Sequence, residues 1–287
     1  MLLERSVAGW SGKTLFRWLK IGIIIYCLCG FALYYLQDYI LFRPVQISRH
    51  QPYDFKLPHN DINIPFDKTS NLNIVQFLTP DGKKKGVVLY FHGNKKNISW
   101  YAKYAPYFTK HGYEVWMIDY PGFGKSTGKL TEQRLYDFAI QVYKLARTRF
   151  GKDHIIIYGK SMGTGIAAYL ASVKDCKRLI LETPYYSMHS LLGGYFPVFA
   201  VSRLIHYRLP TFEYLANVSA PVIIFHGSAD GVIPYRNAQK LNEVLKPGDE
   251  FLTVTGGSHN DLYDFALVRN KLDSILASPI LPISLYP

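Results

Sequence analysis

The stretch from residue 154 to residue 172, HIIIYGKSMGTGIAAYLAS, constrains the fold of this 287-residue chain more than any other stretch. Its first part, His154 to Tyr158, is apolar and rich in β-branched residues, which is typical of a short strand buried on both faces. After Gly163, apolar residues recur at helical spacing. The Gly-Lys-Ser-Met-Gly sequence between the two parts therefore forms a sharp corner between a strand and a helix.

Ser161 lies at the apex of this corner. A G-x-S-x-G corner holds its central residue in a strained backbone conformation, and Gly159 and Gly163 omit side chains that would collide with the strand and the helix. The first N–H groups of the helix, including that of Met162, then lie beside the Ser161 hydroxyl and can receive an oxyanion. The pattern predicts Ser161 as a nucleophile and the Met162 N–H as one donor of an oxyanion hole.

A second G-x-S-x-G match is centred on Ser126, but a loop precedes it rather than a strand. We therefore expect Ser126 to be a loop residue. Both matches contain Gly-Lys-Ser, the end of a phosphate-binding P-loop. The positions where that loop needs its first glycine hold Asp119 and His154, so nucleotide binding of this kind is excluded.

The rest of the chain alternates between short apolar stretches and helix-length segments. This alternation predicts βαβ units and a mostly parallel sheet flanked by helices. The predicted strands are 62–66, 72–78, 86–91, 113–118, 154–158, 178–181, 221–225 and 250–255; the predicted helices include 99–111, 132–149 and one that ends near residue 276. The aromatic-rich stretch 185–218 is interpreted as a small helical cap that can line an acyl pocket. Ordinary packing of these aromatic residues on the sheet is the alternative.

Three further loops follow predicted strands and carry polar groups. The strand 86–91 runs into His92-Gly93-Asn94, where the N–H of Asn94 is expected to be the second oxyanion donor, whereas His92 is expected to be structural. Asp230 follows the strand 221–225 and can orient an imidazole. His259 follows the strand 250–255 in a glycine-flanked loop. The order Ser, Asp, His, each after a strand, is the one that a hydrolase triad on such a sheet requires.

The N-terminal part contains 17 consecutive uncharged residues, Ile21 to Gln37, with basic residues on both sides. We interpret 21–42 as a single-pass transmembrane anchor, 1–20 as a basic segment, 43–60 as a linker, 61–278 as the main domain and 279–287 as a tail. A signal peptide cleaved near Ala32 is the alternative. Four basic residues precede the span and three follow it closely. This bias favours a cytoplasmic N-terminus and a domain on the non-cytoplasmic side.

The composition and charge of the chain indicate which classes of molecule it can bind. The formal net charge of +12 is spread along the chain, and nothing resembles a nucleic-acid-binding module. The charge can attract the chain to anionic lipid headgroups. Three cysteines, two of them in the apolar segment, indicate neither a disulfide framework nor a metal cluster.

Together these motifs resemble the α/β-hydrolase superfamily over residues 60 to 278. The N-terminal span and the Leu41-Phe42-Arg43-Pro44 sequence resemble its membrane-anchored branch, which is related to protein depalmitoylases and to lysophospholipid and monoacylglycerol lipases. The resemblance implies Ser161 as nucleophile, His259 as general base and acid, and Asp230 as the orienting acid. It implies the N–H groups of Asn94 and Met162 as the oxyanion hole.

The implied activity is that of a serine hydrolase that cleaves a carboxylic ester or thioester of an acyl or lipid-type substrate through an acyl-enzyme, with no need for a cofactor or metal. Two alternatives stay open: a serine peptidase that acts on small peptides, and a catalytically silent binding module on the same fold. The sequence leaves the oligomeric state open.

Overall fold

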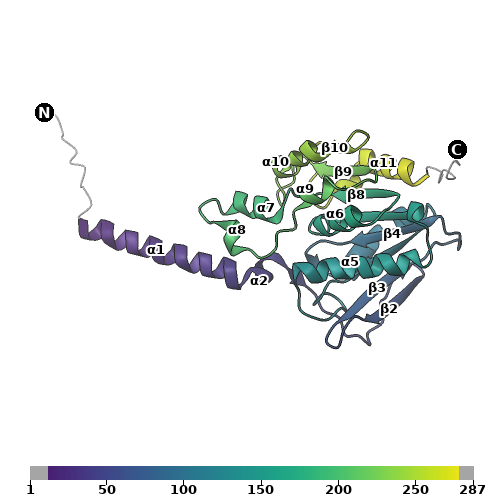
Figure 1. The fold of residues 1–287 in the computed structure, drawn as a ribbon, viewed down its shortest axis with the longest axis horizontal. Coiled ribbons are helices and arrows are strands. Elements are labelled where there is room, and N and C mark those ends of the chain that lie inside the picture. The colour runs from purple at the N-terminus through teal and green to yellow at the C-terminus, as the bar shows by residue number, and fades with distance from the viewer. Residues whose placement is uncertain (1–11, 278–287) are drawn as a thin grey trace.

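The structure is a computed structural model that describes residues 12–277. The predicted tail 279–287 and the first eleven residues of the predicted basic segment lie outside the described residues. An eight-stranded sheet forms the centre of the domain, and one long helix extends away from it (Figure 1).

The order of the strands across the sheet is β10-β9-β8-β7-β4-β6-β3-β2. The pairs β2/β3 and β3/β6 are antiparallel, and all other neighbours are parallel. The strands are β2 (His59–Pro65), β3 (Asn71–Phe77), β4 (Gly86–Phe91), β6 (Tyr113–Ile118), β7 (Ile155–Lys160), β8 (Arg178–Glu182), β9 (Val222–Gly227) and β10 (Glu250–Val254). The predicted mostly parallel sheet is thereby confirmed.

Helices cover both faces of this sheet (Figure 1). One face packs against α5 (Glu132–Arg147) and α6 (Gly163–Val173), and the other against α3 (Ile98–Tyr101), α4 (Pro106–Thr109) and α11 (Ala266–Ala277). Side chains along the central strands alternate between the two cores: Ile155 and Ile157 of β7 contribute to the first core, and Ile156 and Tyr158 to the second. A strand buried on both faces is therefore apolar at most of its positions.

The chain reverses its direction of travel across the sheet at β4. From β4 it moves to β6 on one side, and then returns to β7 on the other side of β4 before continuing to β8, β9 and β10. In open α/β sheets, ligands bind beyond the carboxyl ends of the strands at such a switch point. The loops after β4 and β7, which carry Asn94 and Ser161, meet there.

One predicted helix is wrong in its extent. Residues 99–111 do not form a continuous helix; instead α3, the 3₁₀ turn η1 (Ala102–Tyr104) and α4 follow one another. Pro106 begins α4 at its first position. A proline ring has no N–H to donate to the carbonyl oxygen four residues earlier, so the regular hydrogen-bond ladder of one helix is interrupted at this position.

The stretch between β8 and β9 contains three short helices, α7 (Met188–Tyr195), α8 (Val201–Leu204) and α9 (Thr211–Leu215). The helices α7 and α8 lie beyond the carboxyl edge of the sheet, as expected for the small helical cap, whereas α9 lies against α6 (Figure 1). The remaining elements of the C-terminal part are short: α10 (Tyr235–Gln239), η3 (Lys240–Val244) and η4 (Leu262–Asp264). The 3₁₀ turn η2 (Lys152–His154) leads into β7.

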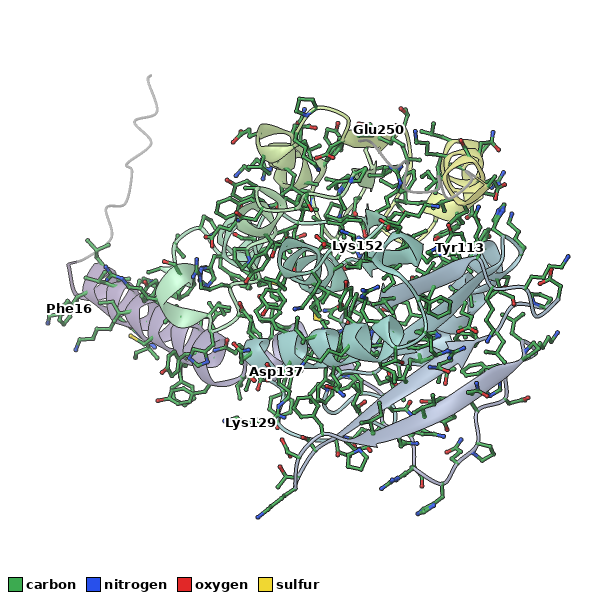
Figure 2. All side chains as sticks on the ribbon, turned by 45° about the vertical axis from the view of Figure 1, so that its right-hand side comes forward. Phe16, Tyr113, Lys129, Asp137, Lys152 and Glu250 are labelled. Atoms are coloured by element: carbon green, nitrogen blue, oxygen red, sulfur yellow. The ribbon has the colours of Figure 1, made fainter. Side chains whose placement is uncertain are left out.

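The N-terminal helix α1 (Gly12–Tyr35) is long and apolar enough to cross a membrane, and none of its apolar window is buried in the protein. Most of its side chains are exposed, with Phe16 near its outer end (Figure 2), and Leu33 is its buried residue. A short helix, α2 (Gln37–Leu41), follows directly. The helix thus begins nine residues before the predicted anchor and is interrupted at Leu36.

The predicted linker packs along the domain instead of bridging open space. Its first residues form β1 (Arg43–Pro44), which pairs with β5 (Lys95–Lys96) in a two-stranded sheet. Further along, Gln46 forms a bridge with Gly124, and Tyr53 is buried with its hydroxyl bound to Asn73 and Asp119. The prolines of this segment predict an extended conformation, and the segment is extended. Its backbone also pairs with two other segments of the domain.

Candidate active site

The corner after β7 has the strained geometry expected of it. Ser161 has a φ of 53°, a left-handed conformation that side chains other than glycine rarely adopt. A Cβ on Gly159 would lie 2.6 Å from the carbonyl oxygen of Gly163, and a Cβ on Gly163 would lie 2.1 Å from the carbonyl oxygen of Phe91 in β4. The two glycines therefore let strand, corner and helix pack closely enough to hold Ser161 at the sheet edge.

Three side chains from three loops form a continuous hydrogen-bonded chain at this edge. The Oγ of Ser161 lies 2.9 Å from Nε2 of His259, and Nδ1 of His259 lies 2.8 Å from Oδ2 of Asp230. The residues are 8%, 9% and 6% exposed, so these three side chains are largely shielded from solvent. A hydroxyl, an imidazole and a carboxylate in this order form the arrangement that activates a serine for nucleophilic attack.

The carboxylate of Asp230 is held by its own loop. Its Oδ1 accepts hydrogen bonds from the N–H groups of Val232 and Ile233, both at 2.8 Å, which leaves Oδ2 for His259. Burial raises the pKa of Asp230, but the hydrogen bond and the charge of His259, together with the two N–H donors, outweigh it and lower the pKa overall. The group therefore stays ionised and can stabilise a protonated imidazole.

A second histidine lies close to the same carboxylate. Nε2 of His226 is 3.6 Å from Oδ2 of Asp230 and 3.0 Å from the carbonyl oxygen of Ile233. Burial lowers the pKa of His226, which favours its neutral form. A neutral His226 donates to the Ile233 carbonyl and shapes the loop, while the negative charge of Asp230 remains directed at His259.

Asn94 and Met162 flank Ser161 and line the same groove. Among the hydrogen bonds of residues 12–277, none has the backbone N–H of either residue as its donor. Met162 precedes the first residue of α6, where N–H groups have no partner inside the helix. Both N–H groups are thus available to an oxygen that develops negative charge beside Ser161.

Two cavities meet at Ser161. The first, about 160 Å³, extends toward β5 and is lined by polar and aromatic residues and by three lysines. Its lining consists of Gly93, Asn94, Lys95, Lys96, Trp100, Tyr101, Lys160, Ser161, Val232, His259 and Asn260. The second, about 360 Å³, is an apolar groove between α2, α7 and the loop after β9. Its lining consists of Ile40, Leu41, Phe42, Asn94, Ser161, Met162, Tyr185, Met188, Leu191, Leu192, Tyr195, Gly231, Val232 and Ile233.

A buried ion pair stabilises the corner between β7 and α6. The ammonium of Lys160 contacts Oε1 of Glu182, and both side chains are at most 2% exposed. Glu182 also accepts a hydrogen bond from the hydroxyl of Tyr158, and Lys160 lies 3.4 Å from the carbonyl oxygen of His259. The pair thus connects the ends of β7 and β8 with the loop that carries His259. Neither Lys160 nor Glu182 is predicted as a site residue from the sequence.

We expect Glu182→Gln to lower the free energy of unfolding by about 3 kcal/mol, because it leaves the Lys160 ammonium buried without a compensating charge. Denaturation of the full chain by urea in a non-ionic detergent measures the change. Glu213→Gln is the matched control, since Glu213 pairs with Arg208 at an exposed position. This control should stay within about 0.5 kcal/mol of wild type. Equal losses in the two variants would contradict the importance of the buried pair.

The other candidate residues have structural surroundings. Ser126 is a buried loop residue, as expected, and its Oγ accepts a hydrogen bond from the N–H of Asn73 at 2.8 Å. His92 is fully buried with Nε2 3.3 Å from Asp119. Asp261, two residues after His259, precedes η4 and accepts two hydrogen bonds from Ser258, both at 2.7 Å. Within the described residues, no group of three His, Cys, Asp or Glu side chains is arranged to hold a metal ion.

The sheet order, the strained corner after β7 and the helices on both faces define the α/β-hydrolase fold. Solved structures share it. An esterase of Pyrococcus furiosus superimposes with a TM-score of 0.64 over 82% of this chain and 97% of its own, at 18% identity. An α/β hydrolase of Vibrio vulnificus reaches 0.62 over 76% and 80%, at 19% identity.

Sequence relatives agree with the fold. The family model described as "Serine aminopeptidase, S33" matches residues 82–214. "Alpha/beta hydrolase domain-containing protein 17C" of Xenopus tropicalis is 30% identical over 195 residues, which are 66% of this chain and 61% of the relative. The human protein of the same description is 27% identical, over 75% of this chain and 66% of its own length. The chain therefore spans a little under two thirds of these relatives. It shares the α/β-hydrolase fold with the solved structures and is similar in sequence to these α/β-hydrolase-domain proteins.

Proposed function

We propose that the protein is a serine hydrolase that cleaves carboxylic esters or thioesters of apolar acyl chains at a membrane surface. The observation that carries this proposal is the hydrogen-bonded chain of Ser161, His259 and Asp230 at the edge of an apolar groove. The branch of membrane-anchored lipid hydrolases and depalmitoylases that the N-terminal sequence resembles is the source of the proposed substrate class.

Acylation is the first step. Ser161 Oγ attacks the carbonyl carbon while His259 Nε2 takes the hydroxyl proton, and Asp230 stabilises the imidazolium that results. The oxygen of the tetrahedral intermediate is held by the N–H groups of Asn94 and Met162. When the intermediate collapses, the bond to the leaving group breaks, and His259 returns the proton to the departing oxygen or sulfur. The acyl group remains on Ser161.

Deacylation repeats the same steps with water. His259 takes a proton from a water molecule, whose oxygen attacks the acyl carbon and forms a second tetrahedral intermediate. Its collapse breaks the ester bond to Ser161, whose oxygen recovers the proton from His259. The carboxylic acid leaves, the substrate has gained the elements of water, and Ser161 and His259 are returned to their starting protonation states, so no cofactor takes part.

The second candidate function, a serine peptidase for small peptides, is favoured by the printed description of the matching family model. An aminopeptidase has to bind the positive N-terminus of its substrate, for which a carboxylate near the nucleophile is suited. Neither cavity that meets at Ser161 has an Asp or Glu in its lining, and one of them has three lysines. This charge supports acyl hydrolysis over aminopeptidase activity. Turnover of an acyl ester compared with an aminoacyl amide distinguishes the two.

We further propose that α1 is a retained single-pass anchor with the domain on the non-cytoplasmic side. Its 24 residues extend over about 36 Å at 1.5 Å per residue, enough for a hydrocarbon core of about 30 Å. Retention is supported by its contacts with the cap: the ring of Tyr26 stacks on Phe199 at 4.6 Å. Cleavage near Ala32 would remove this contact.

A chain that begins at Leu36 should keep its kcat on a short soluble ester within about twofold, yet lose a factor of about 10² on a long-chain ester in vesicles, because α1 supplies effective concentration and not chemistry. Removing residues up to Pro44 would be a poorer test, since α2 and Phe42 line the groove. The measurement is the rate on the two esters at matched protein.

The control is the same shortened chain bound to vesicles through an unrelated anchor, which should recover the vesicle rate. Equal vesicle rates with and without α1 would contradict a role in presenting the protein to its substrate. A fluorophosphonate that fails to label Ser161 in the full chain would instead contradict the hydrolase itself.

A further inference from the structure

We infer that residues Gln37–Arg43, between the membrane helix and the domain, contribute to substrate binding and to the geometry of the active site. They form one wall of the acyl groove, and they fix the loop that carries the proposed oxyanion donor Asn94. This inference rests on the proposed function and extends it: the site takes a long, extended acyl chain that reaches Ser161 past α2.

The groove is built from the first part of the cap, from the loop after β9 and from this segment. Ile40, Leu41 and Phe42 line one side, while Met188, Leu191 and Leu192 of α7 are among the residues on the other. No charged residue is among the lining residues, and Ser161 and Met162 also belong to the lining. An acyl chain gains about 0.8 kcal/mol for each methylene that such a surface removes from water. The chemistry of the groove therefore selects an apolar chain attached to the reacting carbonyl.

The same segment holds Asn94 at two atoms. The N–H of Arg43 donates to the carbonyl oxygen of Asn94 at 2.8 Å, and the side-chain amide of Asn94 donates to the carbonyl oxygen of Leu41. The pairing of β1 with β5 continues this contact into Lys95. The carbonyl and the side chain of Asn94 are both bound to residues 41–43. Its backbone N–H is therefore the polar group of Asn94 that is available to an oxygen beside Ser161.

The segment is itself fixed to the cap. Oε1 of Gln37 accepts a hydrogen bond from the N–H of His206 at 2.7 Å, and Asp38 accepts one from the hydroxyl of Tyr207 at 2.8 Å. The ring of Phe42 lies edge-on to that of Tyr207, with centroids 4.8 Å apart. In Figure 1, α2 accordingly lies at the junction of α1, the cap and the sheet edge.

These contacts join the anchor to the chemistry. α1 touches the cap through Tyr26 and Phe199, and α2 follows α1 after a single residue. An acyl chain of a substrate that leaves the bilayer beside α1 contacts α2 before it reaches Ser161. A connection that served only as a tether would need neither an apolar surface on the groove nor two hydrogen bonds to the oxyanion loop.

Neighbouring residues of α2 allow a matched test of the groove wall. Ile40 lines the groove and is 41% exposed, whereas Tyr39 is 80% exposed and is not among the lining residues. Full-length Ile40→Asp and Tyr39→Asp would be compared in non-ionic detergent. The rates of Ser161 labelling would be measured with alkyl fluorophosphonates of two and ten carbons, and turnover with 4-nitrophenyl acetate and decanoate.

Ile40→Asp should lower the ratio of the long-chain to the short-chain rate about tenfold, because a charge replaces apolar contact with the chain. Tyr39→Asp should keep the wild-type ratio. An equal change in both variants, or in neither, would overturn the groove wall. No labelling of wild type by either probe would overturn the proposed function first, and the inference with it.

A second pair of variants tests the hydrogen bond from the side chain of Asn94 to Leu41. Asn94→Ala removes the side-chain hydrogen bond to Leu41 but keeps the backbone N–H, so we expect kcat on 4-nitrophenyl acetate to fall about fivefold with KM unchanged. Asn97 makes an equivalent bond to the carbonyl oxygen of Val45, at 2.8 Å, and is not among the lining residues of either cavity at Ser161. Asn97→Ala should lower thermal stability without lowering kcat. A loss of kcat that tracks stability in both variants would overturn the positioning role.

Discussion

Ser161→Ala is expected to lower kcat by about 10³ to 10⁶, because the acyl-enzyme route is lost with the nucleophile and only binding and the oxyanion donors remain. Binding of an acyl chain should survive, since the groove is lined largely by residues that the change does not touch. Hydrolysis of a soluble acyl ester by the purified full chain, compared before and after the substitution, is the measurement.

Ser126→Ala is the control, because Ser126 is the central residue of the other G-x-S-x-G match. Its hydroxyl accepts the N–H of Asn73. The variant should therefore lose about 1 to 2 kcal/mol of stability through an unpaired buried N–H but keep most of its activity. If Ser161→Ala and Ser126→Ala lose activity equally while both remain folded, the assignment of Ser161 as the nucleophile fails.

The strands and the corner were predictable because their information is local. The run Ile155 to Tyr158 is apolar at each position, as is typical of a doubly buried strand, and the corner needs glycine at both Gly159 and Gly163 for close approach. The strand 86–91 and the strand 113–118 have the bounds that the sequence predicts. The strand after Gly151 extends two residues further than expected, to Lys160.

The order of polar residues after the strands was sufficient to predict that Ser161, Asp230 and His259 lie at one sheet edge. Parallel strands end on the same side, so residues that follow them become neighbours although 98 positions separate Ser161 from His259. The hydrogen bonds that aim Asp230 at His259 depend on the conformation of residues 230–233, and no residue pattern encodes that conformation. The sequence therefore predicts which residues meet but not how each carboxylate oxygen is used.

What the sequence did not reveal depends on contacts between distant segments. The 43–60 stretch contains prolines typical of a linker, yet its pairing with Lys95 and Gly124 is set by the domain that it packs against. The partnership of Lys160 with Glu182 joins residues 22 positions apart, and lysine and glutamate are common on protein surfaces. A lysine inside the corner, where neighbouring residues are buried, was the one signal that pointed to a buried charge.

Asp230→Asn is expected to lower kcat by about 10⁴, the loss known for this change in a serine protease triad. An amide nitrogen directed at His259 would donate to Nδ1, so the imidazole would carry its proton on Nε2 and could no longer accept one from Ser161. The fold should persist, because the Oδ1 of asparagine still accepts the N–H groups of Val232 and Ile233. The measurement is kcat on a soluble acyl ester, with circular dichroism to verify folding.

Asp261→Asn is the matched control for this loss, since Asp261 lies two residues after His259 but faces Ser258. Its asparagine can accept the N–H of Ser258 through Oδ1 and donate to the Ser258 hydroxyl through its amide, so the loop keeps both contacts. This variant should retain kcat within about threefold, as expected when a group does not contact the reacting atoms. A larger loss in Asp261→Asn than in Asp230→Asn would identify Asp261 as the partner of the imidazole, because only the residue that fixes the tautomer of His259 controls proton transfer from Ser161.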